Sequence, residues 1–186
     1  MKRAMDVVLA VLACMVLAIP AIGLAVVVRL TSPGPVLYWS ERVGRNNVLF
    51  KMPKFRSMRS GAPAVATHLL TDPQAWLTPI GGLLRKTSLD ELPQLWSIIK
   101  GDMSWVGPRP ALFNQYDLID LRTRSGVHRL VPGLTGWAQI NGRDELPISA
   151  KVALDVEYLY RQSVFFDLEI IWKTVWRVLL WDNVSH

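Results

Sequence analysis

Residues 85–110 read RKTSLDELPQLWSIIKGDMSWVGPRP and place two neighbouring carboxylates, Asp90 and Glu91, near the start of a predicted short helix. Ser88 and Glu91 have the spacing of a capping box, in which each side chain bonds the backbone N–H of the other. Gly101 is a typical helix stop. The apolar residues between these signals recur at helical spacing and form one predicted face: Leu92, Leu95, Trp96 and Ile99. The pattern predicts an amphipathic helix with an acidic first turn.

Pro93 limits where this helix can begin, because proline is tolerated only in the first turn of a helix. The first helical residues are therefore expected near Leu89 or Asp90. Carboxylates there stabilise a helix by about 0.3–1 kcal/mol through its dipole, which is one interpretation of Asp90 and Glu91. One carboxylate suffices for a cap, however, and adjacent residues point about 100° apart around a helix. The second carboxylate indicates a further role.

Cations flank the acidic turn on both sides. Arg85 and Lys86 precede it, and the tripeptide Pro108-Arg109-Pro110 follows it. Proline fixes its own φ and biases the preceding residue to an extended conformation. The backbone of Arg109 is therefore stiff, and a stiff arginine suits bidentate recognition of a phosphate. Carboxylates beside such arginines predict a site for phosphate chemistry.

The composition indicates one domain with an anionic partner. The chain has 186 residues, 51% of them hydrophobic, and a formal net charge of +6. The sequence pI near 9.8 favours nucleic acid, anionic lipid headgroups or nucleotide substrates as partners. Cys14 is the single cysteine of the chain. A disulfide within the chain is therefore excluded, which suits a reducing compartment.

Residues 7–28 carry no charge and allow three interpretations. A signal peptide has basic residues first, as Lys2 and Arg3 are here, but its apolar region usually runs about 7–15 residues. A single membrane span fits the length, since the segment would reach about 33 Å across a hydrocarbon core of about 30 Å, but both of its flanks are basic. The third interpretation is a re-entrant helical hairpin that breaks at Pro20 and returns to the same membrane face. The residues alone slightly favour the span.

The remaining elements predict an α+β fold that is mainly α. Strands over residues 36–42 and 48–52 are predicted to form a hairpin. Helices are predicted from Thr78-Pro79 onward and over residues 111–124, 149–161 and 165–181. The last helix has tryptophans along an apolar stripe and basic residues opposite, which is typical of a helix in a membrane interface. Packing in a protein core explains the same pattern equally well.

Three charged residues elsewhere in the chain are candidate site residues. Lys54 and Arg56 belong to a basic run over residues 51–59. This run either faces solvent and anionic headgroups, at about 1 kcal/mol per residue, or contacts a substrate phosphate. Asp155 falls on the apolar face of the helix predicted over residues 149–161, where an unpaired charge is costly. It either pairs with an arginine or supports an active site.

Four motifs of this chain resemble the bacterial sugar transferase family, which comprises small monotopic polyprenyl-phosphate phosphoglycosyl transferases. They are TSLDELPQLWSIIKGDMSWVGPRP at 87–110, LVPGLTGWAQINGR at 130–143, KFRSM at 54–58 and LDVEYLY at 154–160. The likeness extends from the apolar N-terminus to about Trp181. A glycine-rich loop by itself, such as residues 132–143, is a weak signal for anion binding. The match of these residues to the family's motif is a strong signal for it.

The resemblance implies a topology and a location. It implies a re-entrant, helix-break-helix membrane hairpin over residues 1–30, with Pro20 at the break. Ile19 stands where relatives often have serine. A small mixed catalytic domain over residues 31–163 is expected to contain the short β-hairpin, followed by an amphipathic interfacial helix over residues 164–186. The expected location is the bacterial inner membrane, monotopic, on the cytoplasmic face.

The resemblance also implies a reaction and its residues. Asp90 is expected to attack the β-phosphate of a UDP-sugar, to release UMP and to hold the phosphosugar covalently until polyprenyl phosphate accepts it. Glu91 is expected to assist proton removal, and Mg²⁺ is the expected cofactor, held by Asp90 and phosphate oxygens. The residues expected to bind phosphate or nucleotide are Lys54, Arg56, Arg85, Arg109, Gln139, Asn141 and Arg143. Those expected to support the site are Pro108, Pro110 and Asp155.

The expected partners are a UDP-sugar, undecaprenyl phosphate and anionic phospholipid, with no nucleic acid, and the apolar surface is compatible with a homodimer. Two other functions fit the same basic and aromatic residues. A Leloir-type glycosyltransferase would move only the sugar and release UDP. A non-catalytic module would bind anionic lipid and would keep that activity without the Asp90 carboxylate. The sequence does not identify the sugar.

Overall fold

A β-hairpin forms the first sheet of the fold. The computed structural model describes residues 1–63, 65, 72–142 and 146–179. Strands β1 (Leu37–Val43) and β2 (Leu49–Phe55) pair antiparallel from Leu37 opposite Phe55 to Val43 opposite Leu49. Their connection places Asn46 and Asn47 at positive φ, which asparagine tolerates better than most residues. The predicted hairpin is confirmed, and β2 runs three residues further than expected, so that it includes Lys54.

A second sheet joins segments that are distant in sequence. Strands β3 (Ser104–Val106) and β4 (Gly133–Thr135) pair parallel, and the sequence did not predict them. The two backbones approach so closely beside this sheet that a Cβ atom on Gly133 would lie 2.1 Å from the backbone nitrogen of Gly107. Glycine is required at such a contact. The sheet brings the loop that follows β3, with its Pro-Arg-Pro motif, beside the glycine-rich segment.

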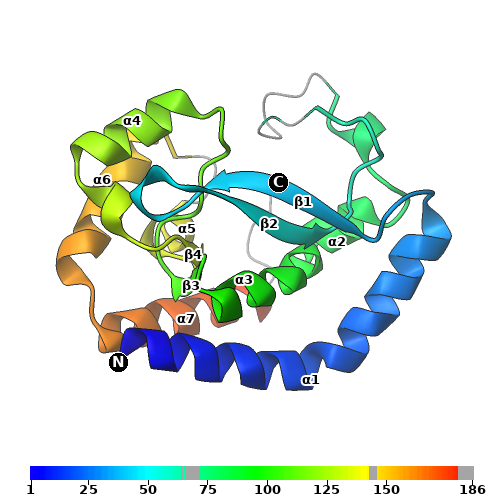
Figure 1. Ribbon diagram of the computed structural model, residues 1–186, viewed down its shortest axis with the longest axis horizontal. Helices are drawn as coiled ribbons and strands as arrows, with labels where there is room; N and C mark the ends of the chain where they lie inside the picture. Colours follow the sequence, from blue (N-terminus) through cyan, green and yellow to red (C-terminus); the bar gives the residue numbers. More distant parts are fainter. Residues whose placement is uncertain (64, 66–71, 143–145, 180–186) are drawn as a thin grey trace.

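Helices surround the two sheets (Figure 1). They are α1 (Lys2–Thr31), α2 (Gly81–Lys86), α3 (Leu95–Lys100), α4 (Tyr116–Arg124), α5 (Trp137–Ile140), α6 (Ile148–Arg161) and α7 (Val164–Leu179), with short 3-10 helices at Arg45–Asn47, Gln74–Trp76, η4 (Leu89–Gln94) and Val127–Arg129. The fold is mainly helical with short sheets, as predicted. The helix expected from residue 111 begins only at Tyr116, and the one expected at Thr78 begins at Gly81.

Helix α1 continues through Pro20 and bends between its first and second halves (Figure 1). Proline removes one N–H and its ring clashes with the carbonyl four residues earlier, which kinks a helix. The predicted interruption is therefore a bend within a continuous helix. The helix is long and apolar enough to cross a membrane.

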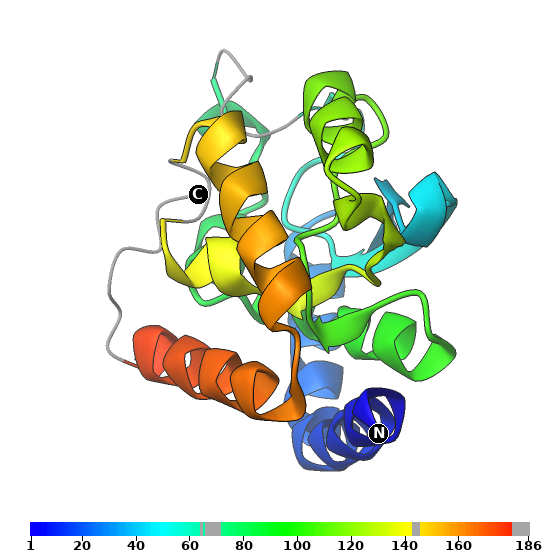
Figure 2. The ribbon, with the colours of Figure 1, turned by 90° about the vertical axis from the view of Figure 1, so that its left-hand side faces the viewer.

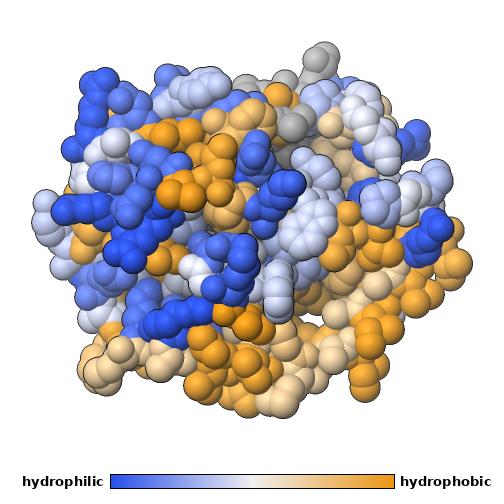
Figure 3. Space-filling view, in the orientation of Figure 1, coloured by the Kyte–Doolittle hydropathy of each residue, from blue (hydrophilic) through white to orange (hydrophobic). Residues whose placement is uncertain are grey.

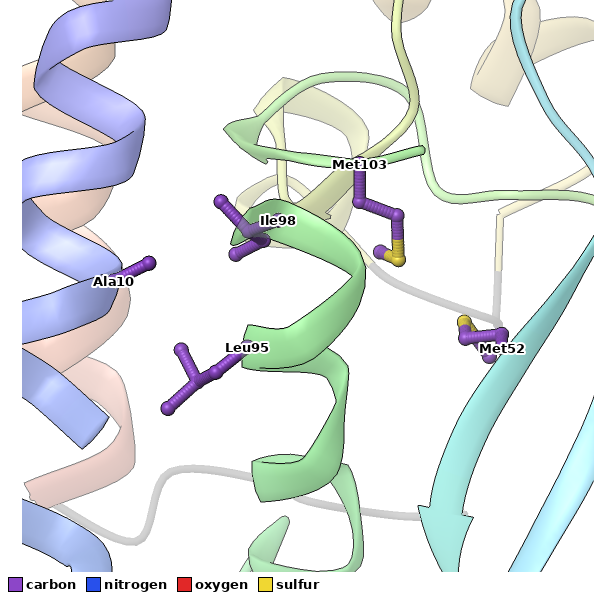
Figure 4. Packing of buried hydrophobic residues seen from close by; sticks show 5 residues of the cluster. All are labelled: Ala10, Met52, Leu95, Ile98 and Met103. Atoms are coloured by element: carbon purple, nitrogen blue, oxygen red, sulfur yellow. The ribbon is translucent and has the colours of Figure 1, made fainter. Parts of the chain in front are cut away.

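Both halves of α1 pack on the same domain. Ala10 contacts the cluster formed by Met52, Leu95, Ile98 and Met103 (Figure 4), and Val28 packs with Phe55 and Leu84. The domain-facing side chains are mostly small and recur along one stripe: Ala10, Ala13, Cys14, Leu17, Ala21, Leu24, Ala25 and Val28. The larger apolar side chains of α1 are exposed, including Val8, Leu12, Met15, Val16, Ile19, Ile22, Val26 and Leu30. The outward surface of α1 is therefore apolar along both halves.

Polar contacts fix the beginning of α1 to the domain. Lys2 Nζ donates to Asp167 Oδ2 at 2.6 Å, and Arg3 Nη2 donates to the carbonyl of Ile99 at 2.7 Å, at the end of α3. Asp6 is buried and accepts a 2.8 Å hydrogen bond from Ser104 Oγ. The basic residues before the apolar segment are thus bonded to the protein.

Helix α7 lies beside the first half of α1 at the lower edge of the molecule (Figures 1 and 2). It too exposes large apolar side chains, namely Phe165, Leu168, Trp172, Val175 and Trp176. In the space-filling view the lower edge, along which α1 lies in front of α7, is hydrophobic (Figures 1 and 3). Two adjacent helices with exposed apolar and tryptophan side chains suggest association with a membrane.

Asp167→Ala is expected to lower the free energy of unfolding by about 1–3 kcal/mol. Asp167 is fully buried and also accepts the hydroxyl proton of Tyr158 at 2.7 Å, so two donors lose a partner. Hydrogen exchange over residues 2–6 should quicken in the variant. Glu169→Ala, which removes an exposed pair with Lys173 on the same helix, is the matched control and should change stability by less than about 0.5 kcal/mol. Equal protection of residues 2–6 in both variants would contradict the anchoring role.

Candidate active site

The acidic segment is a 3-10 helix, η4, that leads into α3. Ser88 has φ 57° and makes no side-chain cap, so the predicted capping box is wrong. The backbone N–H of Glu91 bonds the carbonyl of Ser88 instead, at 3.1 Å. Pro93 has no N–H to continue an α-helical ladder, which accounts for the tighter helix.

The change of helix type alters the buried face. Leu92 packs with the Val28 cluster and Leu95 with the Ala10 cluster, as predicted. Trp96, however, is 58% exposed, and Ile98 is fully buried in its place. A 3-10 helix turns about 120° per residue and an α-helix about 100°. An apolar face predicted at the α-helical period through both segments is therefore rotated away from the face that is buried in the structure.

Two cations share one oxygen of Glu91. Lys54 Nζ, from β2, donates to Glu91 Oε1 at 2.7 Å, and Arg109 Nη2 donates to the same oxygen at 2.8 Å. Lys54 Nζ also lies 3.7 Å from Asp90 Oδ2. The Asp90 side chain is only 7% exposed. The structure therefore brings together four predicted site residues from three segments: Lys54, Asp90, Glu91 and Arg109.

The two carboxylates have opposite pKa shifts. Burial raises the pKa of Asp90 above its usual value, against the opposing influence of Lys54, Arg109 and Arg85. Burial also acts to raise the pKa of Glu91, but the charges and hydrogen bonds of Arg109 and Lys54 outweigh it and hold that pKa well below its usual range. Arg109 and Lys54 affect the two carboxylates unequally. They act mainly on Glu91, because both bond it directly.

The backbone of the Pro-Arg-Pro segment is held from several sides. The carbonyl of Pro108 accepts the backbone N–H of Gly133 at 2.9 Å, and the carbonyl of Pro110 accepts Arg42 Nη1 at 3.2 Å. The carbonyl of Arg109 accepts Arg122 Nη1 at 2.8 Å. The position of Arg109 thus depends on these contacts as well as on the stiffness of the two prolines.

Asp155 reaches this segment through Arg122. Asp155 Oδ2 accepts Arg122 Nε at 2.9 Å and Arg122 Nη2 at 2.7 Å, and both side chains are buried. Burial raises the pKa of Asp155, against the opposing charge and hydrogen bonds of Arg122. The predicted pairing of Asp155 with an arginine is confirmed. Sequence reasoning missed Arg122 itself, although it shares the buried face of α4 with Leu118, one turn before it.

The other predicted basic residues lie differently. Arg56 is buried, and its Nη2 donates to the carbonyl of Ser32 at 2.7 Å, just beyond the end of α1. Among the described residues, its Nε and Nη1 atoms have no hydrogen-bond partner. Arg85 lies in the last turn of α2 and acts electrostatically on Asp90. Arg143 lies outside the described residues.

The two predicted amides of the glycine-rich segment also differ from each other. Gln139 has buried side-chain nitrogen and oxygen atoms that find no hydrogen-bond partner within the described parts of the chain. Asn141 Nδ2 donates to the carbonyl of Trp137 at 2.8 Å and lines a pocket between α5 and α7. The one hydrogen bond found, that of Asn141, does not reach the Asp90–Glu91 pair.

Comparison with known proteins supports the predicted family. The model of the family described as bacterial sugar transferase matches residues 1–181. The UDP-glucose:undecaprenyl-phosphate glucose-1-phosphate transferase of Escherichia coli K12 is 41% identical over 95% of this chain and 40% of its own length. The N-acetylgalactosamine counterpart of Aeromonas hydrophila, a UDP-N-acetylgalactosamine-undecaprenyl-phosphate N-acetylgalactosaminephosphotransferase, is 34% identical over 96% of this chain and 43% of its own length.

A shorter relative matches over most of its length. The uncharacterized sugar transferase EpsL of Bacillus subtilis is 39% identical over 100% of this chain and 91% of its own. The chain therefore spans about two fifths of the longer relatives and most of this one. It belongs to the bacterial sugar transferase family.

Proposed function

We propose that this protein is a transferase that moves a phosphosugar from a UDP-sugar to undecaprenyl phosphate and releases UMP. The observation that carries the proposal is the buried Asp90 carboxylate beside Lys54 and the Glu91–Arg109 pair. The names of the relatives describe sugar phosphotransferases that act on undecaprenyl phosphate, and this agrees with a site built for phosphate. Those two names differ in the sugar, so they do not fix the donor here.

In the first step, a carboxylate oxygen of Asp90 attacks the β-phosphorus of the donor. The bond from that phosphorus to the bridging oxygen breaks, and the bridging oxygen leaves with the α-phosphate as UMP. Asp90 then carries the sugar phosphate as an acyl phosphate. Burial that raises the pKa of Asp90 also leaves its ionised form poorly solvated and therefore reactive.

Lys54 and Arg109 are positioned to change partners when the donor binds. Both bond Glu91 Oε1 in the free protein, and a diphosphate offers more acceptor oxygens and more negative charge than one carboxylate. We therefore expect the donor to take over these two cations, which then stabilise charge on the transferring phosphoryl group. Glu91 is released by the exchange and becomes available as a base.

In the second step, an oxygen of undecaprenyl phosphate attacks the phosphorus of the adduct. The bond between phosphorus and Asp90 breaks, which regenerates the carboxylate and gives undecaprenyl diphosphate-sugar. Glu91 accepts the proton when the acceptor phosphate is monoprotonated. The bonds formed and broken balance without an oxidant or reductant.

Magnesium remains part of the proposal. The described residues contain no group of three or more His, Cys, Asp or Glu side chains that could hold a metal ion. Mg²⁺ sites in phosphoryl-transfer enzymes commonly use one or two carboxylates and complete the shell with substrate phosphates, and Asp90 fits that pattern. When bound, the ion would neutralise charge on the diphosphate.

The packing of α1 supports the proposed membrane topology. Both halves of α1 pack on one domain and the outward side chains are apolar. A helix held to the domain at both ends cannot place those ends on opposite membrane faces. This supports the re-entrant, monotopic arrangement. We place it at the cytoplasmic face of the inner membrane because the proposed nucleotide sugar comes from the cytosol. Contacts of Arg56, Gln139 and Arg143 with the nucleotide, and a homodimer, remain predictions.

The released nucleotide tests the proposal. Full-length protein in undecaprenyl phosphate-containing nanodiscs with Mg²⁺ should release UMP with at least one member of a panel of UDP-sugars. The lipid product should carry both the sugar and one additional phosphate. Release of UDP without UMP would establish the Leloir-type alternative. Lipid binding without any nucleotide release across the panel would favour the non-catalytic module.

A further inference from the structure

A pocket of about 280 Å³ lies between α5 and α7. Its lining residues come from the two helices and the residue after α5: Trp137, Ile140, Asn141, Trp172, Lys173, Trp176 and Arg177. None of them belongs to the Lys54–Asp90–Glu91–Arg109 cluster. Three tryptophans and two cations in one small pocket point to a ligand with both an apolar and an anionic part.

The walls of this pocket are fixed by contacts within the protein. Trp137 Nε1 donates to Glu157 Oε2 at 2.8 Å, so the Trp137 side chain of α5 is bonded to α6. Thr174 of α7 bonds Thr135 of β4 at 2.7 Å between their hydroxyl oxygens. These two contacts hold Trp137 and the position of α7, so this part of the wall loses little freedom when a ligand enters.

On the α7 side of the pocket, two tryptophans and two basic residues form two neighbouring i,i+4 pairs. Trp172 and Trp176 are one helical turn apart, and their rings stack with centroids 6.2 Å apart. Lys173 and Arg177 form the adjacent pair, also one turn apart. Lys173 Nζ lies 5.2 Å from the centroid of the Trp137 ring and pairs with the exposed Glu169. An anion that entered beside Trp137 would meet both cations.

The position of α7 indicates where such an anion would come from. The helix lies beside α1 at the apolar lower edge of the molecule (Figures 1 and 2), and Trp172 and Trp176 are 67% and 54% exposed. Tryptophan is enriched at the depth of lipid headgroups, and basic pockets at that depth bind anionic headgroups. A volume near the lower limit of about 300 Å³ for ligand pockets suits a headgroup better than a nucleotide sugar.

We infer that this pocket binds the headgroup of an anionic glycerophospholipid, with its phosphodiester between Lys173 and Arg177 and its glycerol backbone against the tryptophans. The bound lipid would fix the depth of α7 in the membrane interface. The inference rests on membrane association and on this pocket, and it stands or falls separately from phosphosugar transfer.

Native mass spectrometry of the full-length protein tests this inference. The protein, released from phosphatidylcholine nanodiscs, is offered equal amounts of phosphatidylglycerol and phosphatidylcholine. Wild-type protein should retain one phosphatidylglycerol in preference to phosphatidylcholine. Lys173→Gln/Arg177→Gln should lose that preference, while Lys100→Gln/Arg124→Gln, which removes one lysine and one arginine at exposed positions outside the pocket, should keep it. Lys173 is 46% exposed and glutamine is a good helix former, so the melting temperature should not change.

Three results would overturn the inference. One is an unchanged phosphatidylglycerol adduct in Lys173→Gln/Arg177→Gln, and another is equal retention of both lipids by wild-type protein. The third is displacement of the retained lipid, one for one, by added undecaprenyl phosphate, which would assign the pocket to the acceptor. UMP release by the same variants, measured alongside, separates these results from a failure of the proposed transfer reaction.

Discussion

Asp90→Asn is expected to reduce UMP release by about 10³-fold or more, because an amide cannot form the acyl phosphate. The variant should fold normally. Burial raises the folded-state pKa of Asp90 above its unfolded value, so the stability contributed by this group is present at low pH and is lost as pH rises through the folded pKa. At neutral pH the ionised carboxylate thus opposes folding, and neutral asparagine avoids that cost. We expect a melting temperature equal to or above that of wild type.

Asp102→Asn is the matched control for this prediction. Asp102 is an aspartate outside the cluster that pairs with Lys100, whose side chain is 59% exposed. Its loss should leave both UMP release and stability near wild type. Turnover by Asp90→Asn within tenfold of wild type would contradict a nucleophilic role for Asp90. A large fall in its melting temperature would contradict the burial argument.

Asp155→Asn is expected to lower the free energy of unfolding by about 3–5 kcal/mol, the usual cost of leaving a buried charge without its partner. The unpaired charge is that of Arg122, whose side chain is 9% exposed. Asp120→Asn removes an exposed pair with Arg124 on the same helix as Arg122, and it should cost less than about 1 kcal/mol. Chemical denaturation in detergent micelles measures both.

The double variant Arg122→Met/Asp155→Leu separates stability from positioning. Replacing a buried ion pair by apolar residues is often neutral or stabilising, so the double variant should recover most of the stability lost by Asp155→Asn. It still lacks the bond from Arg122 to the carbonyl of Arg109. We therefore expect its KM for the UDP-sugar to rise several-fold with a smaller change in kcat. A wild-type KM would show that Arg122 does not position Arg109.

Local sequence signals predicted the elements whose contacts are local. The hairpin followed from alternating strands around Asn46-Asn47, and α6 and α7 followed from their apolar periodicity. The cluster of Lys54, Asp90, Glu91 and Arg109 followed from their motifs. A short stretch of sequence carries the whole signal for the hairpin and the two helices, whereas the four site residues come from family motifs in three separate segments.

Features that depend on distant contacts were not predicted. Strands β3 and β4 have three residues each, too few for a periodic pattern, and they exist because Gly107 and Gly133 approach closely. The capping box failed because Ser88 adopts a left-handed conformation before a 3-10 turn. The partners of Lys2 and Asp6 lie about a hundred residues or more along the chain, and no local pattern indicates them.

The covalent adduct is the most direct test of the account. Full-length protein is incubated with an active UDP-sugar and Mg²⁺ without acceptor, quenched with acid, and digested for peptide mass mapping. We predict one added sugar phosphate on the peptide that contains residues 85–100, located at Asp90, and its loss when undecaprenyl phosphate is added before quenching. UMP release without any adduct on that peptide, or an adduct retained in Asp90→Asn, would contradict the central claim.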